Sequence, residues 1–237
     1  MMRPDRPRGE QVKRFVMGMT VALAVAALPA LASADLVDVI ATGDKVKLAD
    51  EPGANATSGT GTGGAFRLTT QNSPTDSWVT FCLEVTETFT YNTSYYVKVN
   101  SGAMNGGAGG AVNGFDPLDN RTAFAYWTYR QQLEGLPTGT SWAGADMQYY
   151  IWFMEQELPP LKGSSSPIDT WVNANIGNWQ NNGQVVVLNL YDSMDRNGNF
   201  SGNRQDQLAL GPVQVPEPAS MLLLGLGLLG VATRIRR

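Results

Sequence analysis

The alternation of apolar and polar residues predicts a body built mainly of β-strands. Short segments that are rich in β-branched and aromatic residues, or apolar at every second position, are typical of strands. These segments are 35–50 (one or two strands), 64–71, 78–85, 91–99, 184–191 and 205–210. Segments 51–64 and 101–114 are rich in small or polar residues and have no periodicity, which predicts loops.

The middle of the chain has a helical pattern instead. The predicted helices cover 119–134, 141–158 and 166–178. Asp119 or Asn120 can cap the first helix, Pro159 and Pro160 end the second, and Pro167 suits the first position of the third.

The order of strands, then helices, then strands predicts a β-rich α+β fold. We expect one extracellular domain at 35–212, a β-sandwich or barrel with a helical insertion at about 116–180. This domain is long enough for a hydrophobic core of its own. A signal peptide on one side and a short apolar sorting helix on the other are expected to flank it.

The first 34 residues have the pattern of a secretory signal peptide. The basic residues Arg3, Arg6, Arg8, Lys13 and Arg14 precede an apolar segment at 15–28. Ala32 and Ala34 then offer a small-residue cleavage site around Ser33. An uncleaved membrane anchor is the alternative, but the cleavage site favours removal and export.

Residues 213–237 combine three features in a fixed order. The tripeptide Pro216-Glu217-Pro218 precedes an apolar run at 221–232, and the basic residues Arg234, Arg236 and Arg237 follow it. The run has 12 residues, whereas a stable spanning helix needs roughly 17–25. This order resembles the PEP-CTERM sorting signal of Gram-negative bacteria. The resemblance implies an exosortase as the processing partner, transient insertion of both ends into the inner membrane, and a secreted or cell-surface location.

Charge is distributed unevenly between the ends and the body. The whole chain has a formal net charge of −4, but residues 35–215 contain 9 Lys and Arg and 18 Asp and Glu, a net charge of 9 − 18 = −9. Binding of nucleic acid or of an anionic membrane surface needs basic patches. The acidic body therefore argues against nucleic acid as a partner.

Composition also restricts the possible chemistry. The chain has no histidine and one cysteine, Cys82. Ser-His-Asp and Cys-His catalysis, imidazole-ligated zinc sites, internal disulfides and cysteine-rich metal clusters are therefore excluded. No pair of acidic residues has a recognisable catalytic arrangement, although a pair formed in space is invisible in the sequence. We expect no metal, no cofactor and no enzymatic activity; an enzyme acting on exopolysaccharide ranks last.

The single cysteine of an exported chain requires an explanation. One interpretation is a small buried side chain on a strand, since free cysteine is among the most buried residue types. The other rests on two motifs, Phe81-Cys82-Leu83-Glu84 and, on a predicted helix, Met147-Gln148-Tyr149-Tyr150-Ile151-Trp152. Together they resemble the two signatures of bacterial thioester domains, an aromatic-Cys-aliphatic strand motif and a Gln-x-x-aliphatic-Trp helix motif. Met147 stands where threonine is common in that family.

The resemblance implies an internal thioester between the sulfur of Cys82 and the side chain of Gln148. Shielding by Phe81, Tyr149 and Trp152 would limit its hydrolysis. We therefore predict a covalent adhesin that acylates partner amines, the partner being an amine-bearing surface protein or exopolysaccharide. The alternative is a passive structural or carbohydrate-binding component of an exopolysaccharide matrix, with Cys82 buried in the core.

Segment 192–201 resembles part of a calcium loop. Asp195, Asn197 and Gly198 are suitably close, but Arg204 stands where the EF-hand pattern requires a bidentate acid. A polar turn between two strands is the better interpretation.

Overall fold

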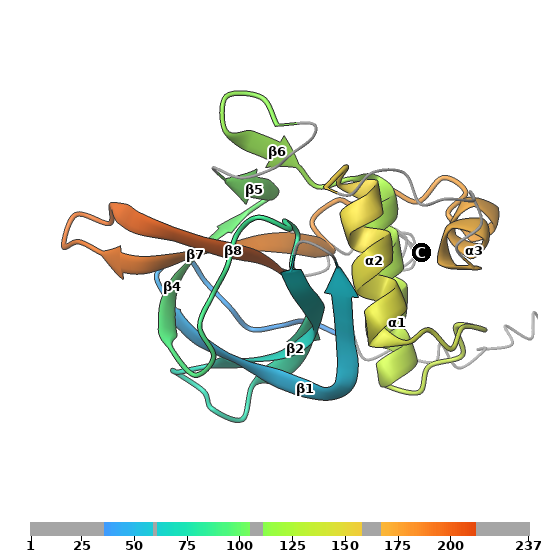
Figure 1. Cartoon of the computed structure of the whole chain (residues 1–237), viewed down its shortest axis with the longest axis horizontal. Coiled ribbons are helices and arrows are strands. Elements are labelled where there is room, and N and C mark those ends of the chain that lie inside the picture. Colours follow the sequence, from blue (N-terminus) through green and yellow to red (C-terminus); the bar gives the residue numbers. More distant parts are fainter. Residues whose placement is uncertain (1–35, 59–60, 105–110, 158–166, 212–237) are drawn as a thin grey trace, which may run out of the picture. The chain divides into compact units, whose positions relative to one another are not determined.

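The computed structural model describes residues 36–58, 61–104, 111–157 and 167–211. The strands in this part of the chain are β1 (Lys45–Ser58), β2 (Gly61–Thr70), β3 (Ser77–Thr80), β4 (Ser94–Asn100), β5 (Gly102–Met104), β6 (Phe115–Pro117), β7 (Val185–Met194) and β8 (Phe200–Leu210). The helices are α1 (Asn120–Leu133), α2 (Gly144–Met154) and α3 (Pro167–Asn175). The predicted β-rich fold with a helical insertion is confirmed, because all three helices lie between β6 and β7 in the chain (Figure 1).

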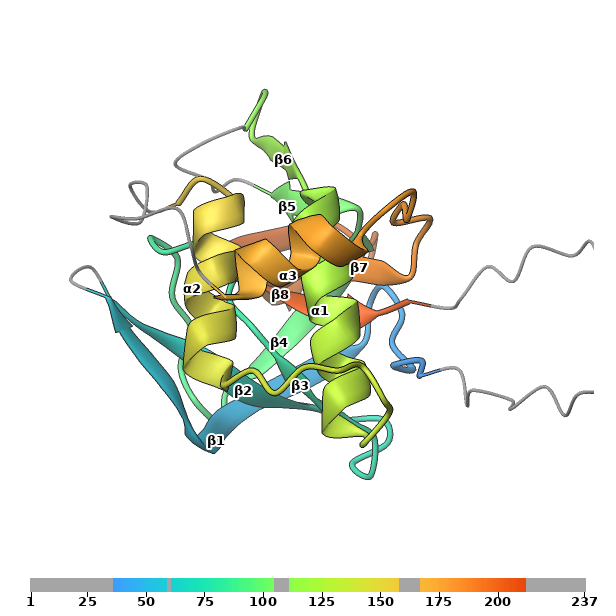
Figure 2. The same cartoon turned by 90° about the vertical axis from the view of Figure 1, so that its right-hand side faces the viewer.

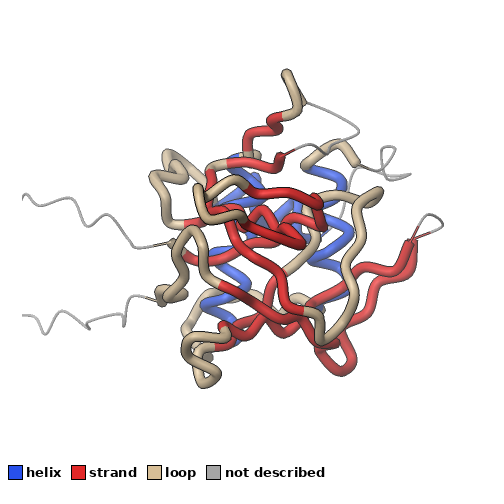
Figure 3. The backbone as a smooth tube through the Cα atoms, turned by 90° about the vertical axis from the view of Figure 1, so that its left-hand side faces the viewer, coloured by secondary structure: helices blue, strands red, loops and turns tan. Residues whose placement is uncertain are grey.

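The strands form one large sheet and one small sheet. The large sheet is antiparallel and has the order β3-β2-β1-β4-β7-β8, and β5 pairs with β6 in a separate two-stranded sheet. The helices cover one side of the large sheet, as Figure 2 shows for α1, α2 and α3, and Figure 3 shows the strands from the opposite side. A layer of helices therefore takes the place that a second large sheet would have in a sandwich.

The predicted barrel is wrong, because no strand ladder closes the described strands into one. The edge strands β3 and β8 nevertheless meet. The Oγ1 of Thr80 accepts from the N–H of Leu208 at 2.9 Å and donates to the Leu208 carbonyl at 2.8 Å. An isolated bridge pairs Cys82 with Gln207. The Thr80 side chain, this bridge and the backbone hydrogen bond from the Leu83 N–H to the Asp206 carbonyl at 3.1 Å thus join the two edges, where a barrel would use a continuous ladder.

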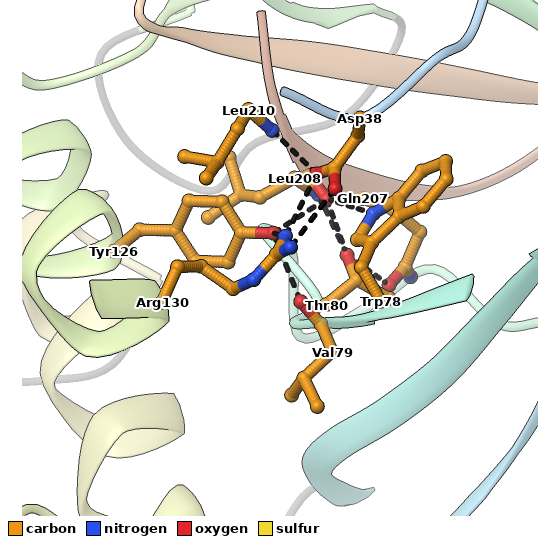
Figure 4. Close-up of polar contacts among 9 residues, drawn as sticks. All are labelled: Asp38, Trp78, Val79, Thr80, Tyr126, Arg130, Gln207, Leu208 and Leu210. Carbon is orange, nitrogen blue, oxygen red and sulfur yellow. Dashed lines mark hydrogen bonds and ion pairs between the residues drawn. The ribbon is translucent and has the colours of Figure 1, made fainter. Parts of the chain in front are cut away.

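A buried ion pair fixes the start of the described chain to its end (Figure 4). The guanidinium of Arg130 donates to both carboxylate oxygens of Asp38, at 2.7 and 2.9 Å. Asp38 also accepts from the N–H of Leu210 at 2.7 Å, and Arg130 donates to the hydroxyl of Tyr126 at 3.0 Å. The first described segment, for which the sequence predicts a strand, is therefore held to β8 by the Asp38 side chain and by one backbone hydrogen bond, from the Asp38 N–H to the Leu210 carbonyl at 3.0 Å.

The segment after β2 divides its side chains between two hydrophobic clusters. Val79, Phe81 and Leu83 belong to the cluster that includes the helices, whereas Trp78 and Cys82 belong to a second cluster within the sheet. Successive side chains of an extended segment point to opposite sides. This alternation therefore places Cys82 inside the sheet cluster, beside Trp152 of α2.

The largest errors of the sequence prediction concern the loops. The expected loop at 51–64 is mostly strand, because β1 continues to Ser58 and pairs with β2, with a register shift between Asp50 and Asn55. Small residues suffice here because backbone hydrogen bonds make the ladder. Within the expected loop at 101–114, residues Gly102–Met104 pair with Phe115–Pro117 just beyond it.

The helix prediction is confirmed in its main features. Asp119 caps α1 by accepting from the N–H of Arg121 at 2.7 Å, Gly135 follows the helix with φ +72°, and Pro167 is the first residue of α3. No helix of the described residues is long and apolar enough to cross a lipid bilayer. The predicted signal peptide and apolar sorting helix lie outside the described residues.

Candidate functional site

Cys82 lies just beyond the end of β3, where the chain has left the sheet ladder. The predicted strand at 78–85 ends at Thr80, and Cys82 keeps only the isolated bridge to Gln207. Its side chain is 4% exposed, and its Sγ accepts a hydrogen bond from Nε2 of Gln207 at 3.7 Å. The backbone of Cys82 therefore needs hydrogen-bond partners other than those of a regular strand.

Gln148 of α2 supplies those partners. Its Nε2 donates to the carbonyl oxygen of Cys82 at 2.7 Å, and its Oε1 accepts from the N–H of Cys82 at 3.0 Å. The N–H of Gly64 donates to the same Oε1 at 3.4 Å. Gln148 is 0% exposed, so its amide is buried and does not face solvent. The structure brings Cys82 and Gln148 together across 66 residues of sequence.

The two backbone N–H groups on Oε1 polarise the Gln148 carboxamide. An oxygen that accepts from two backbone N–H groups is well placed to carry negative charge when a nucleophile attacks its carbon. The thiol belongs to the same residue whose N–H and carbonyl hold the amide. The Gln148 carboxamide thus lies against the backbone of the residue that carries the thiol.

Two of the three predicted shielding residues lie near this pair. Trp152, one turn after Gln148, is 2% exposed and belongs to the cluster of Cys82. Tyr149 packs against that cluster, with its ring 6.1 Å from that of Trp152. Phe81 does not share this position: it packs in the other cluster, against Tyr129 with ring centroids 5.2 Å apart. It faces away because it alternates with Cys82 along an extended segment.

A backbone contact holds Trp152 over the site. A Cβ built on Gly63 would lie 2.2 Å from Cη2 of Trp152 and 3.0 Å from Cγ of Gln148. Any side chain at this position would clash with the indole ring. Glycine at position 63 therefore permits β2 to approach α2 closely enough for the Gly64 N–H to reach Gln148.

A pocket of about 210 Å³ reaches Cys82 from outside. Its other lining residues are Phe66, Glu87, Thr88, Phe89, Tyr91 and Gln205. The rings of Phe66 and Phe89 meet edge to face at 4.9 Å, and Phe89 meets Tyr91 at 5.4 Å. Aromatic walls with one carboxylate suit an amine on an alkyl stem.

Burial controls the charge state of the site. It raises the pKa of the Cys82 thiol to about 12, and the nearby acids Glu84 and Glu87 add to this effect. Burial also raises the pKa of Glu84 to about 11, and its acidic neighbours Glu87 and Asp206 add to this effect. The Cys82 sulfur is therefore a neutral thiol at neutral pH.

Sequence reasoning missed the polar residues that β8 contributes to the site. Gln205, Asp206 and Gln207 are buried in the middle of β8, although such polar residues are usually exposed. Their signal is the unbroken polar run immediately before the apolar end of the strand. A polar run that enters a core must have internal partners, and here the partners are Cys82, Glu84 and their surroundings.

Several predicted site residues lie outside the described residues. These are Ala32 and Ala34 of the signal cleavage site, and Pro216, Glu217, Pro218, Arg234, Arg236 and Arg237 of the sorting motif. The segment at 192–201 contains the turn between β7 and β8, in which Asp195 accepts from the N–H groups of Asn197 and Asn199 at 2.8 and 2.9 Å. The polar turn that we expected there is confirmed.

Comparison with known proteins identifies the C-terminal segment. Residues 214–237 match the family model of the PEP-CTERM protein-sorting motif. The motif indicates an exported surface protein that an exosortase processes. No curated protein and no solved structure matches the chain.

Proposed function

We propose that this exported surface protein is a non-enzymatic covalent adhesin, in which Cys82 and Gln148 form an internal thioester that acylates amines of a partner. The contact of the Gln148 amide with the backbone of Cys82 carries the proposal. The C-terminal motif supports the delivery of such a protein to the cell surface by exosortase. We also propose that the protein comes from a Gram-negative bacterium and that both of its ends insert transiently into the inner membrane.

The thioester forms by exchange of one bond on the Gln148 carbonyl carbon. The Sγ of Cys82 attacks this carbon, the C–Nε2 bond breaks, the thiol proton passes to Nε2, and ammonia leaves. The N–H groups of Cys82 and Gly64 stabilise the negative oxygen of the tetrahedral intermediate. Fixed proximity compensates for a thiol that is neutral at neutral pH.

An amine of the partner then completes the reaction. Its nitrogen attacks the same carbon, the C–S bond breaks, and the amine proton returns to sulfur, so that an amide joins Gln148 to the partner. The pocket lined by Cys82 is the route by which we expect the amine to approach the thioester. Trp152 covers the site and restricts competing hydrolysis by water.

Mass spectrometry of the purified full-length protein tests this proposal. We expect the peptides that contain Cys82 and Gln148 to be linked and lighter by one ammonia, and Cys82 to resist alkylation after unfolding in acid. Methylamine should label Gln148 and release the thiol. Cys82→Ala is the control, because it keeps the backbone groups that bind Gln148 but has no sulfur. Unlinked peptides with an alkylated Cys82 in the wild type would contradict the thioester.

A second candidate function is passive carbohydrate binding in an exopolysaccharide matrix. It is supported by a pocket of about 480 Å³ lined by Trp142, Tyr149 and Tyr150, with Asp146 and Ser141 as polar groups. Aromatic faces beside polar groups suit sugar rings. In this case Cys82 is a buried core residue and methylamine leaves Gln148 unmodified, whereas Trp142→Ala weakens polysaccharide binding.

A further inference from the structure

Three carboxyl groups converge beside the Cys82 pocket. Glu84 and Glu87 follow Cys82 in the chain, and Asp206 lies on β8. Each offers one carboxylate oxygen, and these three atoms lie within 4.8 Å of one another. Glu84 is 2% exposed and Asp206 is 0% exposed. Such proximity of buried carboxylates is costly unless protons or a cation neutralise them.

Four oxygens of this cluster lack donors outside the cluster itself, within the described part of the protein. Both oxygens of Glu84, Oε2 of Glu87 and Oδ1 of Asp206 are buried without such a donor, and a proton shared between Glu84 and Glu87 is the hydrogen bond open to them. The charged groups that act on Glu84 are Glu87, Asp206 and Glu157, all of them acidic. Nearly every buried polar group in a native protein has a partner. The Glu84 carboxylate, aimed at two further carboxylates, therefore points to a ligand.

The remaining oxygens are held in place. Oε1 of Glu87 accepts from Nδ2 of Asn203 at 2.9 Å. Oδ2 of Asp206 accepts from Nδ2 of Asn189 at 2.9 Å and from the N–H of Met104 at 2.8 Å. Such hydrogen bonds orient ligating carboxylates in metal sites. They leave one oxygen of each residue, Oε2 of Glu87 and Oδ1 of Asp206, without a donor.

We propose that Glu84, Glu87 and Asp206 bind one Ca²⁺ ion. All available ligands are oxygens, which selects a hard cation, and several carboxylates at a flexible separation suit Ca²⁺ better than the strict octahedron of Mg²⁺. Glu87 also lines the pocket, so water can complete the coordination. The expectation of no metal site rests on the lack of histidine and of multiple cysteines, and that argument does not extend to carboxylate ligands.

Bound Ca²⁺ joins two parts of the fold. Glu84 and Glu87 lie on the segment that leaves the sheet after β3, and Asp206 lies at the opposite edge, on β8. The ion thus links the two edges of the large sheet, which no strand ladder joins, directly beside Cys82. The site needs no thioester, and it stands or falls independently of the proposed function.

Calorimetric titration of the chelator-treated, full-length protein in detergent tests the site. We expect one Ca²⁺ per chain, with a dissociation constant of about 10⁻⁴–10⁻³ M, as is usual for extracellular modules. At a Ca²⁺ concentration 100 times this constant, the midpoint of thermal unfolding should rise by roughly 5–10 °C. Mg²⁺ at the same concentration should raise it less.

The variant Glu84→Gln/Asp206→Asn should lose Ca²⁺ binding and the thermal shift. Because two carboxamides relieve the repulsion, this variant should remain folded in chelator, as circular dichroism can verify. Asp195→Asn, in the exposed turn between β7 and β8, is the matched control and should bind like the wild type. The proposal is overturned if Ca²⁺ produces neither binding heat nor a thermal shift in the wild type, or if the double variant binds Ca²⁺ as well as the wild type does. The three carboxyl groups then share protons instead of a cation.

Discussion

The side-chain amide of Gln148 binds both backbone polar groups of Cys82, at 2.7 Å to the carbonyl oxygen and at 3.0 Å from the N–H. A buried helix side chain thus replaces a neighbouring strand at the point where β3 has ended. The contact involves the backbone of Cys82 and not its sulfur. The structural role of Gln148 can therefore be separated from any covalent chemistry by mutation.

Gln148→Ala should be less stable than Cys82→Ala by about 1–3 kcal/mol in the free energy of unfolding, because only the first leaves the Cys82 backbone buried without partners. Neither variant can form a thioester, so their difference does not depend on one; it reports the lost hydrogen bonds together with the larger buried volume that Gln148→Ala removes. Urea unfolding followed by tryptophan fluorescence measures it. Equal stability of the two variants would show that water or a rearranged backbone replaces the lost amide.

Gly63→Ala should disturb the position of Trp152. The added Cβ would lie 2.2 Å from Cη2 of the indole, and the ring must move or β2 must withdraw. Overpacking of this kind costs about 1–3 kcal/mol, and we also expect slower thioester formation and faster hydrolysis. Gly139→Ala is the control, because it adds a methyl group at φ +71° with nothing within 4 Å. It should lose stability through backbone strain without changing the mass of the Cys82 and Gln148 peptides.

The pairing of Cys82 with Gln148 could be predicted from sequence motifs, but its geometry could not. Alternation along 78–85 places Cys82 and Phe81 on opposite sides, as in the structure, and so opposes the shielding by Phe81 that we predicted. It gives no sign that the strand ends at Thr80, because the segment keeps a strand-like pattern after leaving the ladder. The chain can leave the ladder because the Gln148 amide, 66 residues away in the sequence, replaces the strand that would bind the backbone of Cys82.

The other errors have a similar physical origin. Helices such as α1 are predictable because Asp119 and Gly135 are local signals of start and end. The long extension of β1 is not, because glycine and alanine carry no strand periodicity and pair only through their backbones. Glu84 and Asp206 come close together only because the two edges of the large sheet meet. No local sequence pattern predicts that contact between the edges.

Asp38→Ala should destabilise the fold strongly, because it leaves the Arg130 guanidinium buried without its carboxylate (Figure 4). Breaking a buried ion pair by removing one partner costs about 3–5 kcal/mol. Asp192→Ala is the matched control, because Arg204 also binds Asp192 through two hydrogen bonds, but both side chains are largely solvated. It should cost about 1 kcal/mol or less. Thermal unfolding compares the two, and similar losses would contradict the importance of burial.

Glu155 should make the protein less stable as the pH rises. Burial raises the pKa of Glu155 to about 8, and the charges of Asp119 and Asp116 add to this, against the nearby Thr122 hydroxyl and a hydrogen bond from the Asp119 N–H. The folded state therefore keeps a proton that the unfolded state releases above about pH 4.5. The resulting stabilisation is complete below that pH and is lost as the pH increases through 8.

Glu155→Gln should remove this pH dependence, because glutamine is neutral throughout and its Oε1 can still accept from the N–H of Asp119. At pH 8.5 the variant should be more stable than the wild type by an amount on the order of 2–4 kcal/mol, and the difference should shrink toward pH 5. Denaturant unfolding from pH 5 to 8.5 measures both slopes, with the exposed Glu134→Gln as control. Parallel slopes in the wild type and Glu155→Gln would mean that Glu155 is ionised in the folded protein, in which case water or a rearranged partner must reach it between α1 and α2.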